Sequence, residues 1–139
     1  MSLYVVDGQG GGIGRSLIER LRVELPQVQI VAVGSNAMAT ASMLKAGATA
    51  GATGENAVIY CCSHAREQDV IIGPIGIVLA NSMLGELTPK MAQAVSESRA
   101  YKVLIPVQAS RSHAAIVGVE EKTIAQYIED AITILKGMV

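Results

Sequence analysis

A short apolar run followed by a glycine-rich turn is the feature that most constrains how this chain folds. The apolar run at residues 3–6 ends at Asp7, glycines dominate residues 8–14, and a helical pattern begins at Ile13. Glycine permits unusual backbone angles and lets a ligand approach the chain closely. A helix N-terminus offers unpaired N–H groups and a partial positive charge. The stretch therefore predicts a strand, a tight turn and a helix whose N-terminus binds phosphate.

Segments of strand and helix character alternate along the 139 residues, with no break in composition that would mark a second domain. The predicted strands are 3–6, 28–33, 69–72 and 102–107, with weaker candidates at 57–61 and 114–119. The predicted helices are 13–25, about 37–46, 77–84, 89–97 and 124–136. Residues 47–54 are predicted to form a loop of small residues, which could include a short strand or a helical turn. Such alternation indicates a parallel sheet with right-handed crossovers. We therefore predict one α/β domain over residues 1–139, a three-layer, Rossmann-like, doubly wound sheet of five or six mostly parallel strands.

The composition indicates which classes of partner and which cellular compartment to expect. Half of the residues are apolar, Phe and Trp are absent, and the net charge is −1. Nucleic-acid modules need aromatic platforms and a basic field, so no nucleic acid is expected. The longest uncharged stretch, 70–85, is too short to span a membrane. No secretory signal precedes the first strand, and the adjacent Cys61 and Cys62 suit reduced thiols, so a cytoplasmic protein away from membranes is expected.

The spacing of the glycines separates the turn from two common phosphate motifs. The pattern Gly8-x-x-x-Gly12-x-Gly14 departs from the dinucleotide pattern Gly-x-Gly-x-x-Gly, and residues 9–16 lack the lysine and the first glycine of a P-loop. The turn resembles the short-chain dehydrogenase turn Thr-Gly-x-x-x-Gly-Ile-Gly, with Asp7 in place of the threonine. The Tyr-x-x-x-Lys pair of those enzymes is absent, and no acid ends the second predicted strand.

We expect the turn to hold a small phosphate-containing ligand together with two later loops. Ser35 and Asn36 follow the second predicted strand, where a ribose would lie. Gly73 and Pro74 follow a buried strand, and the carboxyl ends of parallel strands share one crevice. The predicted cofactor-binding residues are Gly8, Gln9, Gly10, Gly11, Gly12, Ile13, Gly14, Ser35, Asn36, Gly73 and Pro74. The residues leave NAD(P) and other nucleotides open as the ligand.

Two further groups of reactive side chains carry weaker signals. Cys61, Cys62 and His64 are metal-ligand types, but adjacent cysteines on a strand point to opposite faces, so no metal site is predicted. The serines and histidine of residues 110–113 lack the nucleophile elbow of a serine hydrolase. We expect that segment to be an exposed polar loop.

Three separated segments together resemble one small bacterial family of uncharacterised proteins. They are the turn Asp-Gly-Gln-Gly-Gly-Gly-Ile-Gly at 7–14, the loop 51–56 and the stretch 73–86. The resemblance covers nearly the whole chain. It implies a Rossmann-like fold and implies no activity.

Three functions of different classes agree with these residues. The first is nucleotide or dinucleotide binding by the glycine turn. The second is a non-enzymatic oligomeric scaffold or regulatory protein, because few charges on an apolar chain suggest surface buried between subunits, with a homodimer as the expected assembly. The third is a small NAD(P)-dependent oxidoreductase whose acid–base group would be Glu55, Glu86 or Lys90. Whether the chain is an enzyme, and what Asp7 does, stays open.

Overall fold

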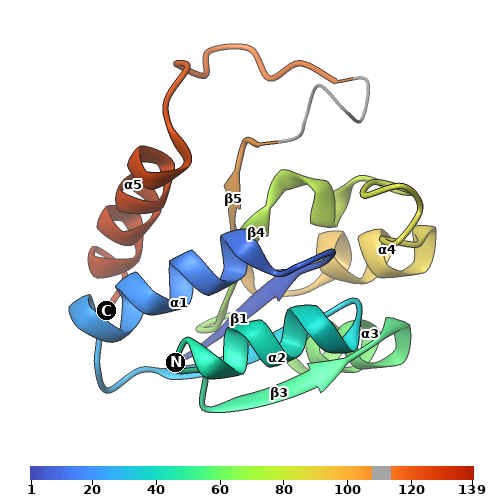
Figure 1. Ribbon diagram of the computed structural model, residues 1–139, viewed down its shortest axis with the longest axis horizontal. Coiled ribbons are helices and arrows are strands. Elements are labelled where there is room, and N and C mark those ends of the chain that lie inside the picture. The colour runs from blue at the N-terminus through green and yellow to red at the C-terminus, as the bar shows by residue number, and fades with distance from the viewer. Residues whose placement is uncertain (108–113) are drawn as a thin grey trace.

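Five parallel strands form the centre of the computed structural model, which describes residues 1–107 and 114–139 (Figure 1). The strands are β1 (Ser2–Asp7), β2 (Gln29–Gly34), β3 (Ala50–Thr53), β4 (Val70–Pro74) and β5 (Tyr101–Ile105). Their order across the sheet is β3-β2-β1-β4-β5, and each neighbouring pair is parallel. This is the Rossmann order with its first five strands. The predicted doubly wound α/β fold is thereby confirmed.

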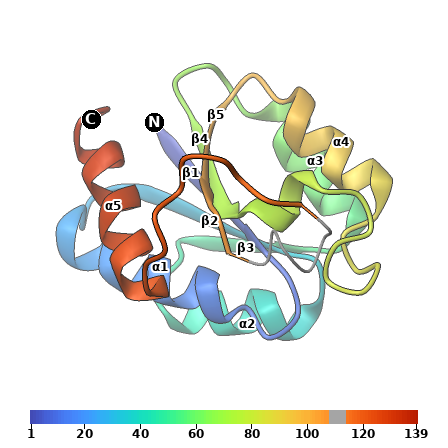
Figure 2. The ribbon, with the colours of Figure 1, turned by 90° about the horizontal axis from the view of Figure 1, so that it is seen from above.

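Helices cover both faces of the sheet. They are α1 (Gly12–Glu24), α2 (Ala37–Lys45), α3 (Glu55–His64), the short 3₁₀ helix η1 (Ile75–Val78), α4 (Pro89–Glu97) and α5 (Ile124–Lys136). Figure 2 shows α1, α2 and α5 on one face and α3 and α4 on the other. Right-handed crossovers produce this division, because the chain runs outward from β1 to β3 and then crosses to β4 on the far side of β1. None of the helices described is long and apolar enough to cross a membrane.

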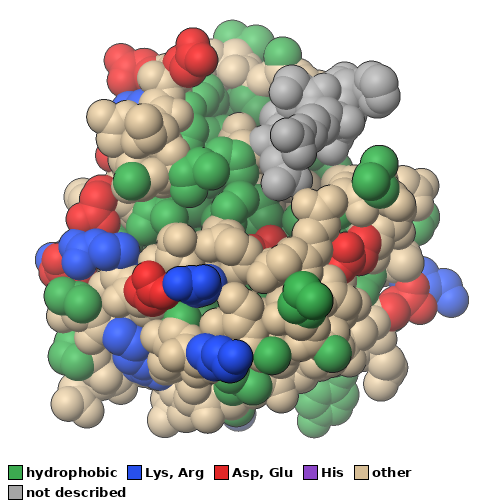
Figure 3. Space-filling model, in the orientation of Figure 1, with side chains coloured by type: hydrophobic (Ala, Val, Ile, Leu, Met, Phe, Trp, Pro, Cys, Tyr) green, Lys and Arg blue, Asp and Glu red, His purple; other side chains and the backbone are tan. Residues whose placement is uncertain are grey.

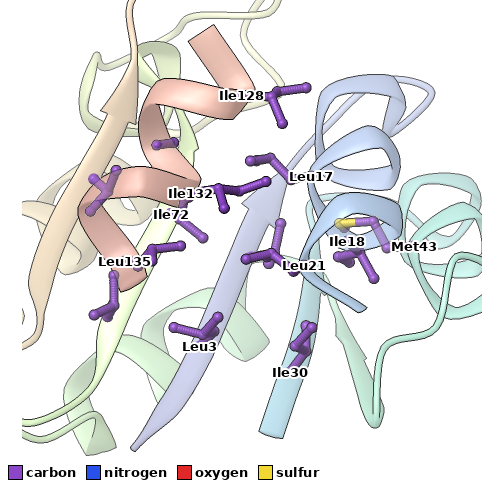
Figure 4. Close-up of a cluster of buried hydrophobic side chains, with 14 of the residues drawn as sticks. Leu3, Leu17, Ile18, Leu21, Ile30, Met43, Ile72, Ile128, Ile132 and Leu135 are labelled. Atoms are coloured by element: carbon purple, nitrogen blue, oxygen red, sulfur yellow. The ribbon is translucent and has the colours of Figure 1, made fainter. Parts of the chain in front are cut away.

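Two apolar clusters hold the three layers together. On the first face Leu17 and Leu21 of α1, one helical turn apart, are fully buried and pack with Ile132 of α5 and Leu3 of β1 (Figure 4). On the second face Val6 of β1 packs with the buried sides of α3 and α4. Successive strand residues point to opposite faces, so β1 contributes to both clusters. The carboxyl end of β1 is thus fixed in the middle of the molecule.

Side-chain N-caps begin two of the helices. The Oγ1 atom of Thr88 accepts the N–H of Met91 at 3.2 Å, and Pro89 takes the first helical position of α4. For α2, the Oδ1 atom of Asn36 accepts the N–H of Ala39 at 2.9 Å. Asn36 is therefore the N-cap of α2.

Three predicted elements were wrong. Residues 57–61 belong to α3 and not to a strand, since Val58, Cys61 and Cys62 are buried at helical spacing. A short apolar run cannot distinguish the two structures by its pattern alone. Residues 114–119 contain no strand. Residues 77–84 form only the end of η1 and an irregular loop, not a helix. The small-residue loop 47–54 contains β3.

Candidate functional site

A cleft of about 290 Å³ opens at the carboxyl end of β1. The strand order reverses between β1 and β4, and ligands of doubly wound sheets bind at such a switch point. The α5 side of the cleft is apolar, since Ile124 lies there and hydrophobic side chains gather between α5 and β5 (Figure 3). The residues that line the cleft are Asp7, Gly8, Gln9, Gly10, Gly11, Gly12, Ile13, Ser16, Met83 and Ile124.

Three glycines of the turn are needed for close packing. A side chain at Gly8 would lie 2.6 Å from the sulfur of Met83 and from Oγ of Ser35. Gly11 has a φ of +71°, and a Cβ atom there would lie 2.9 Å from the backbone of Ala39. Gly14 has no room beside Met43 and Asp7. These positions explain the glycine content of the turn through packing and backbone conformation.

Gly10 and Gly12 are different. Among the residues that the structure describes, nothing lies within 4 Å of the position that a Cβ atom would take at either glycine, and both line the cleft. Within residues 1–107 and 114–139, no acceptor takes the N–H of Gly10 or Gly12, whereas the N–H of Gly11 donates to the carbonyl of Gly8 at 2.9 Å. Both open glycines adjoin the positive N-terminus of α1. The turn therefore keeps two donors and free space at the same place.

Asp7 supports the turn from inside the protein. Its side chain is 4% exposed, and its carboxylate accepts the N–H of Gly8 at 2.8 Å and the N–H of Gly14 at 2.7 Å. Burial raises the pKa of Asp7 above its ordinary value, and the two N–H donors offset only part of that effect. The carboxylate is therefore committed to the backbone of the turn and to the start of α1.

Glu86 joins three loops at the carboxyl edge of the sheet. Its Oε1 atom accepts the N–H of Gln9 at 3.0 Å and also hydrogen bonds from Oγ of Ser35 and Nδ2 of Asn36. Burial by itself would raise the pKa of Glu86, but these hydrogen bonds outweigh burial and hold the pKa below its ordinary value. The loops after β1, β2 and β4 are thus tied together by one carboxylate oxygen.

The loop that carries Glu86 has an unusual backbone. Asn81, Met83 and Leu84 all have positive φ values, of 63°, 56° and 57°, although none is a glycine. Such conformations cost free energy and persist where the surrounding structure imposes them. Met83 of this loop lines the cleft, so the loop forms part of its wall.

The predicted binding residues divide into two groups. Residues Gly8 to Ile13 line the cleft, whereas Gly14, Ser35, Asn36, Gly73 and Pro74 do not. A Cβ atom at Gly73 would overlap the carbonyl of Val6, so this glycine lets β4 approach β1. Ser16, at the end of the glycine-rich stretch, also lines the cleft. Met83 and Ile124 line the cleft without having been predicted, and nothing near either residue in the sequence indicates the cleft.

The other reactive residues lie away from the cleft. Glu55 accepts the hydroxyl of Thr88 at 2.6 Å, which links the starts of α3 and α4, and Lys90 is exposed on α4. Burial raises the pKa of Cys62 to about 12, which leaves an inert thiol. Among the residues described, no three His, Cys, Asp or Glu side chains gather as metal ligands. Ser110, Ser112 and His113 lie outside the described residues.

Together, the parallel sheet, its two helical layers and the cleft at the switch point define a Rossmann-like α/β protein. The chain belongs to the family described as Domain of unknown function (DUF3842), which matches residues 2–139. No curated protein matches the chain. Among solved structures, it is similar to a dodecameric FMN-dependent UbiX-like decarboxylase from Escherichia coli O157:H7, with a TM-score of 0.53 and 18% identity over 99% of this chain and 94% of that chain. At this identity the likeness shows the fold alone.

Proposed function

We propose that the cleft binds a nucleotide-type cofactor through its phosphate. The observation that carries this proposal is the pair of N–H groups at Gly10 and Gly12, which donate to no described acceptor and belong to two residues that line the cleft. They adjoin the N-terminus of α1, whose partial positive charge favours an anion. Two donors and a helix dipole at one open position match the needs of a phosphate.

FMN is the first candidate for this ligand. The UbiX-like decarboxylase with the similar fold is FMN-dependent, and FMN has one phosphate and one flat, largely apolar ring system. The cleft offers backbone donors at Gly10 and Gly12 and apolar side chains at Met83 and Ile124. A phosphate at the turn would thus place the rest of the ligand against the apolar side.

The charges around the turn set the expected strength of binding. No lysine or arginine is found among the described residues that line the cleft, and the carboxylates of Asp7 and Glu86 lie near it. Both carboxylates are already hydrogen-bonded to the backbone of the turn. Within the described residues the anion would be held by backbone N–H groups and the helix dipole, and no ion pair with a lysine or arginine would add to the affinity for FMN.

Titration of the purified protein with FMN tests the proposal. We expect a dissociation constant below about 1 mM, and a loss of about tenfold or more in the variant Gly12→Asp, which places a carboxylate beside the phosphate. Asp is tolerated in the first turn of a helix, so this variant should remain folded. Asn56→Asp is the matched control, because it adds the same charge in the first turn of α3 and does not line the cleft. The absence of FMN binding in the wild-type protein would overturn the proposal for this ligand.

The same proposal includes a homo-oligomer. The similar UbiX-like decarboxylase is dodecameric. In this chain Tyr101 of β5 is 58% exposed, Ile134 of α5 is 49% exposed and Val139 is 66% exposed, which leaves apolar side chains on the α5 and β5 side. Light scattering of the full chain checks this expectation, and a monomer at all concentrations would contradict it.

A further inference from the structure

We infer that Glu86 makes the cleft selective for a mononucleotide over a dinucleotide. The inference rests on the proposed function, because it concerns which nucleotides fit the same cleft. Glu86 would act as a specificity-determining residue by closing the β2 side of the glycine turn.

The end of β2 is the place where a dinucleotide would need polar groups. In Rossmann dinucleotide sites, the ribose of the adenosine half is hydrogen-bonded at the end of the second strand. In this chain the polar side chains at that place are Ser35 and Asn36, and both donate to Oε1 of Glu86. The side chains that would meet a ribose are therefore engaged with a carboxylate of the protein itself.

The same carboxylate also closes the path along the turn. The N–H of Gln9 donates to Glu86 at 3.0 Å, so the backbone on the β2 side of the turn is occupied. Gly8 has Met83 and Ser35 against it, with no space for even a methyl group. The open positions begin only at Gly10.

Hydrogen bonds hold the loop that carries Glu86 in this position. The N–H of Asn81 donates to the carbonyl of Leu87 at 2.7 Å, and the N–H of Leu87 donates to the carbonyl of Ser82 at 3.2 Å. The buried hydroxyl of Ser82 donates to the carbonyl of Gly76 in η1. The loop is therefore bonded across its own base and to η1, which directly follows β4, and this keeps Glu86 at the β2 side.

The open part of the cleft leads the other way. From Gly10 and Gly12 it extends to Ser16 of α1 and to Ile124 of α5. A phosphate with a single nucleoside-like unit fits this arrangement. In FAD, the same phosphate carries an additional AMP unit, and that unit would have to pass the side that Glu86 closes.

Competing titrations with FMN, FAD and NAD test this inference. The wild-type protein should bind FMN about tenfold or more tightly than FAD or NAD. Glu86→Ala should lower this preference for FMN over FAD at least several-fold, because it opens the β2 side. Glu86→Gln keeps the shape of the side chain and should retain most of the preference, which separates obstruction from charge repulsion. Glu67→Ala, an exposed change of the same charge before β4, is the matched control.

Each result has a separate meaning. Equal binding of FMN and FAD, or equal binding of FMN and NAD, by the wild-type protein would overturn the inference and leave the proposed function standing. An unchanged preference in folded Glu86→Ala, confirmed by circular dichroism, would overturn the role of Glu86. If Glu86→Ala does not fold, Ser35→Ala replaces it, because this variant removes one donor to Glu86. Ser35→Ala should then show a weaker preference for FMN over FAD than the wild-type protein, and an unchanged preference would overturn the role of Glu86. No binding of any of the three nucleotides would overturn both the inference and the proposed function.

Discussion

Two consecutive N–H groups of the glycine turn donate to two different carboxylates: Gly8 donates to Asp7 at 2.8 Å and Gln9 donates to Glu86 at 3.0 Å. Asp7 is the last residue of β1 and is buried, whereas Glu86 comes from the loop after β4. Burial raises the pKa of Asp7. For Glu86, burial acts in the same direction, but hydrogen bonds outweigh it and lower the pKa. One turn is therefore shaped by two acids that respond to pH in opposite ways.

Ionisation of Asp7 should reduce the stability of the folded protein. The folded state holds the Asp7 proton more tightly than the unfolded chain, so stability falls as the pH rises from about 3.8 through the higher folded-state pKa. Urea denaturation of wild type and Asp7→Asn across this range checks the expectation. The free energy of unfolding of wild type minus that of the variant should fall with rising pH. An increase with pH would contradict the pKa direction.

Glu86 should show the reverse dependence. Its folded-state pKa is below the ordinary value of 4.5, so its contribution to stability is present above that pH and is lost as the pH falls through the folded-state pKa. The same denaturation series with Glu86→Gln measures this. The advantage of wild type over Glu86→Gln should shrink as the pH falls below about 4.5. A constant difference across the range would show that the three hydrogen bonds do not depend on the charge.

Neighbouring glycines of the turn should differ in their tolerance of alanine. Gly11→Ala should cost at least about 1–2 kcal/mol, because φ is +71° and the added Cβ meets the backbone of Ala39. Gly12→Ala should cost no stability, since the site is open and alanine favours the helix. Chemical denaturation of the two variants checks the contrast. Equal losses at both positions would mean that the space beside Gly12 is not open.

Replacement of Leu84 by glycine should stabilise the protein although it removes a large side chain. Leu84 is fully exposed with a φ of 57°, so the substitution loses no burial and relieves about 1–2 kcal/mol of left-handed strain. The conformational entropy of glycine in the unfolded chain costs about 0.5–1 kcal/mol, which leaves a net gain of up to about 1.5 kcal/mol. Val117→Gly is the control, because Val117 is 98% exposed without a positive φ and should lose stability. Thermal denaturation of both variants distinguishes a gain from a loss.

Much of the fold could be predicted from local patterns. The strand predictions at 3–6, 28–33, 69–72 and 102–107 are confirmed within a few residues. These signals come from residues that are close together in the sequence, within a single helical turn or a single strand. The alternation of strands and helices then indicates a parallel sheet. The helix at 55–64 could not be predicted in the same way, because its apolar run is short enough to suit a strand.

The chain by itself determined the strand, the glycine turn and the helix that follows, because these depend on the backbone preferences of adjacent residues. Only the tertiary structure decided which glycines face open space and which are packed, since the neighbours of Gly8 and Gly11 come from the later loops and from α2. Only the tertiary structure brought Glu86 to Asn36, a separation of 50 positions along the chain. The physical reason is the order of the sheet: β1 lies between β2 and β4, so the loops that follow these strands meet over the glycine turn.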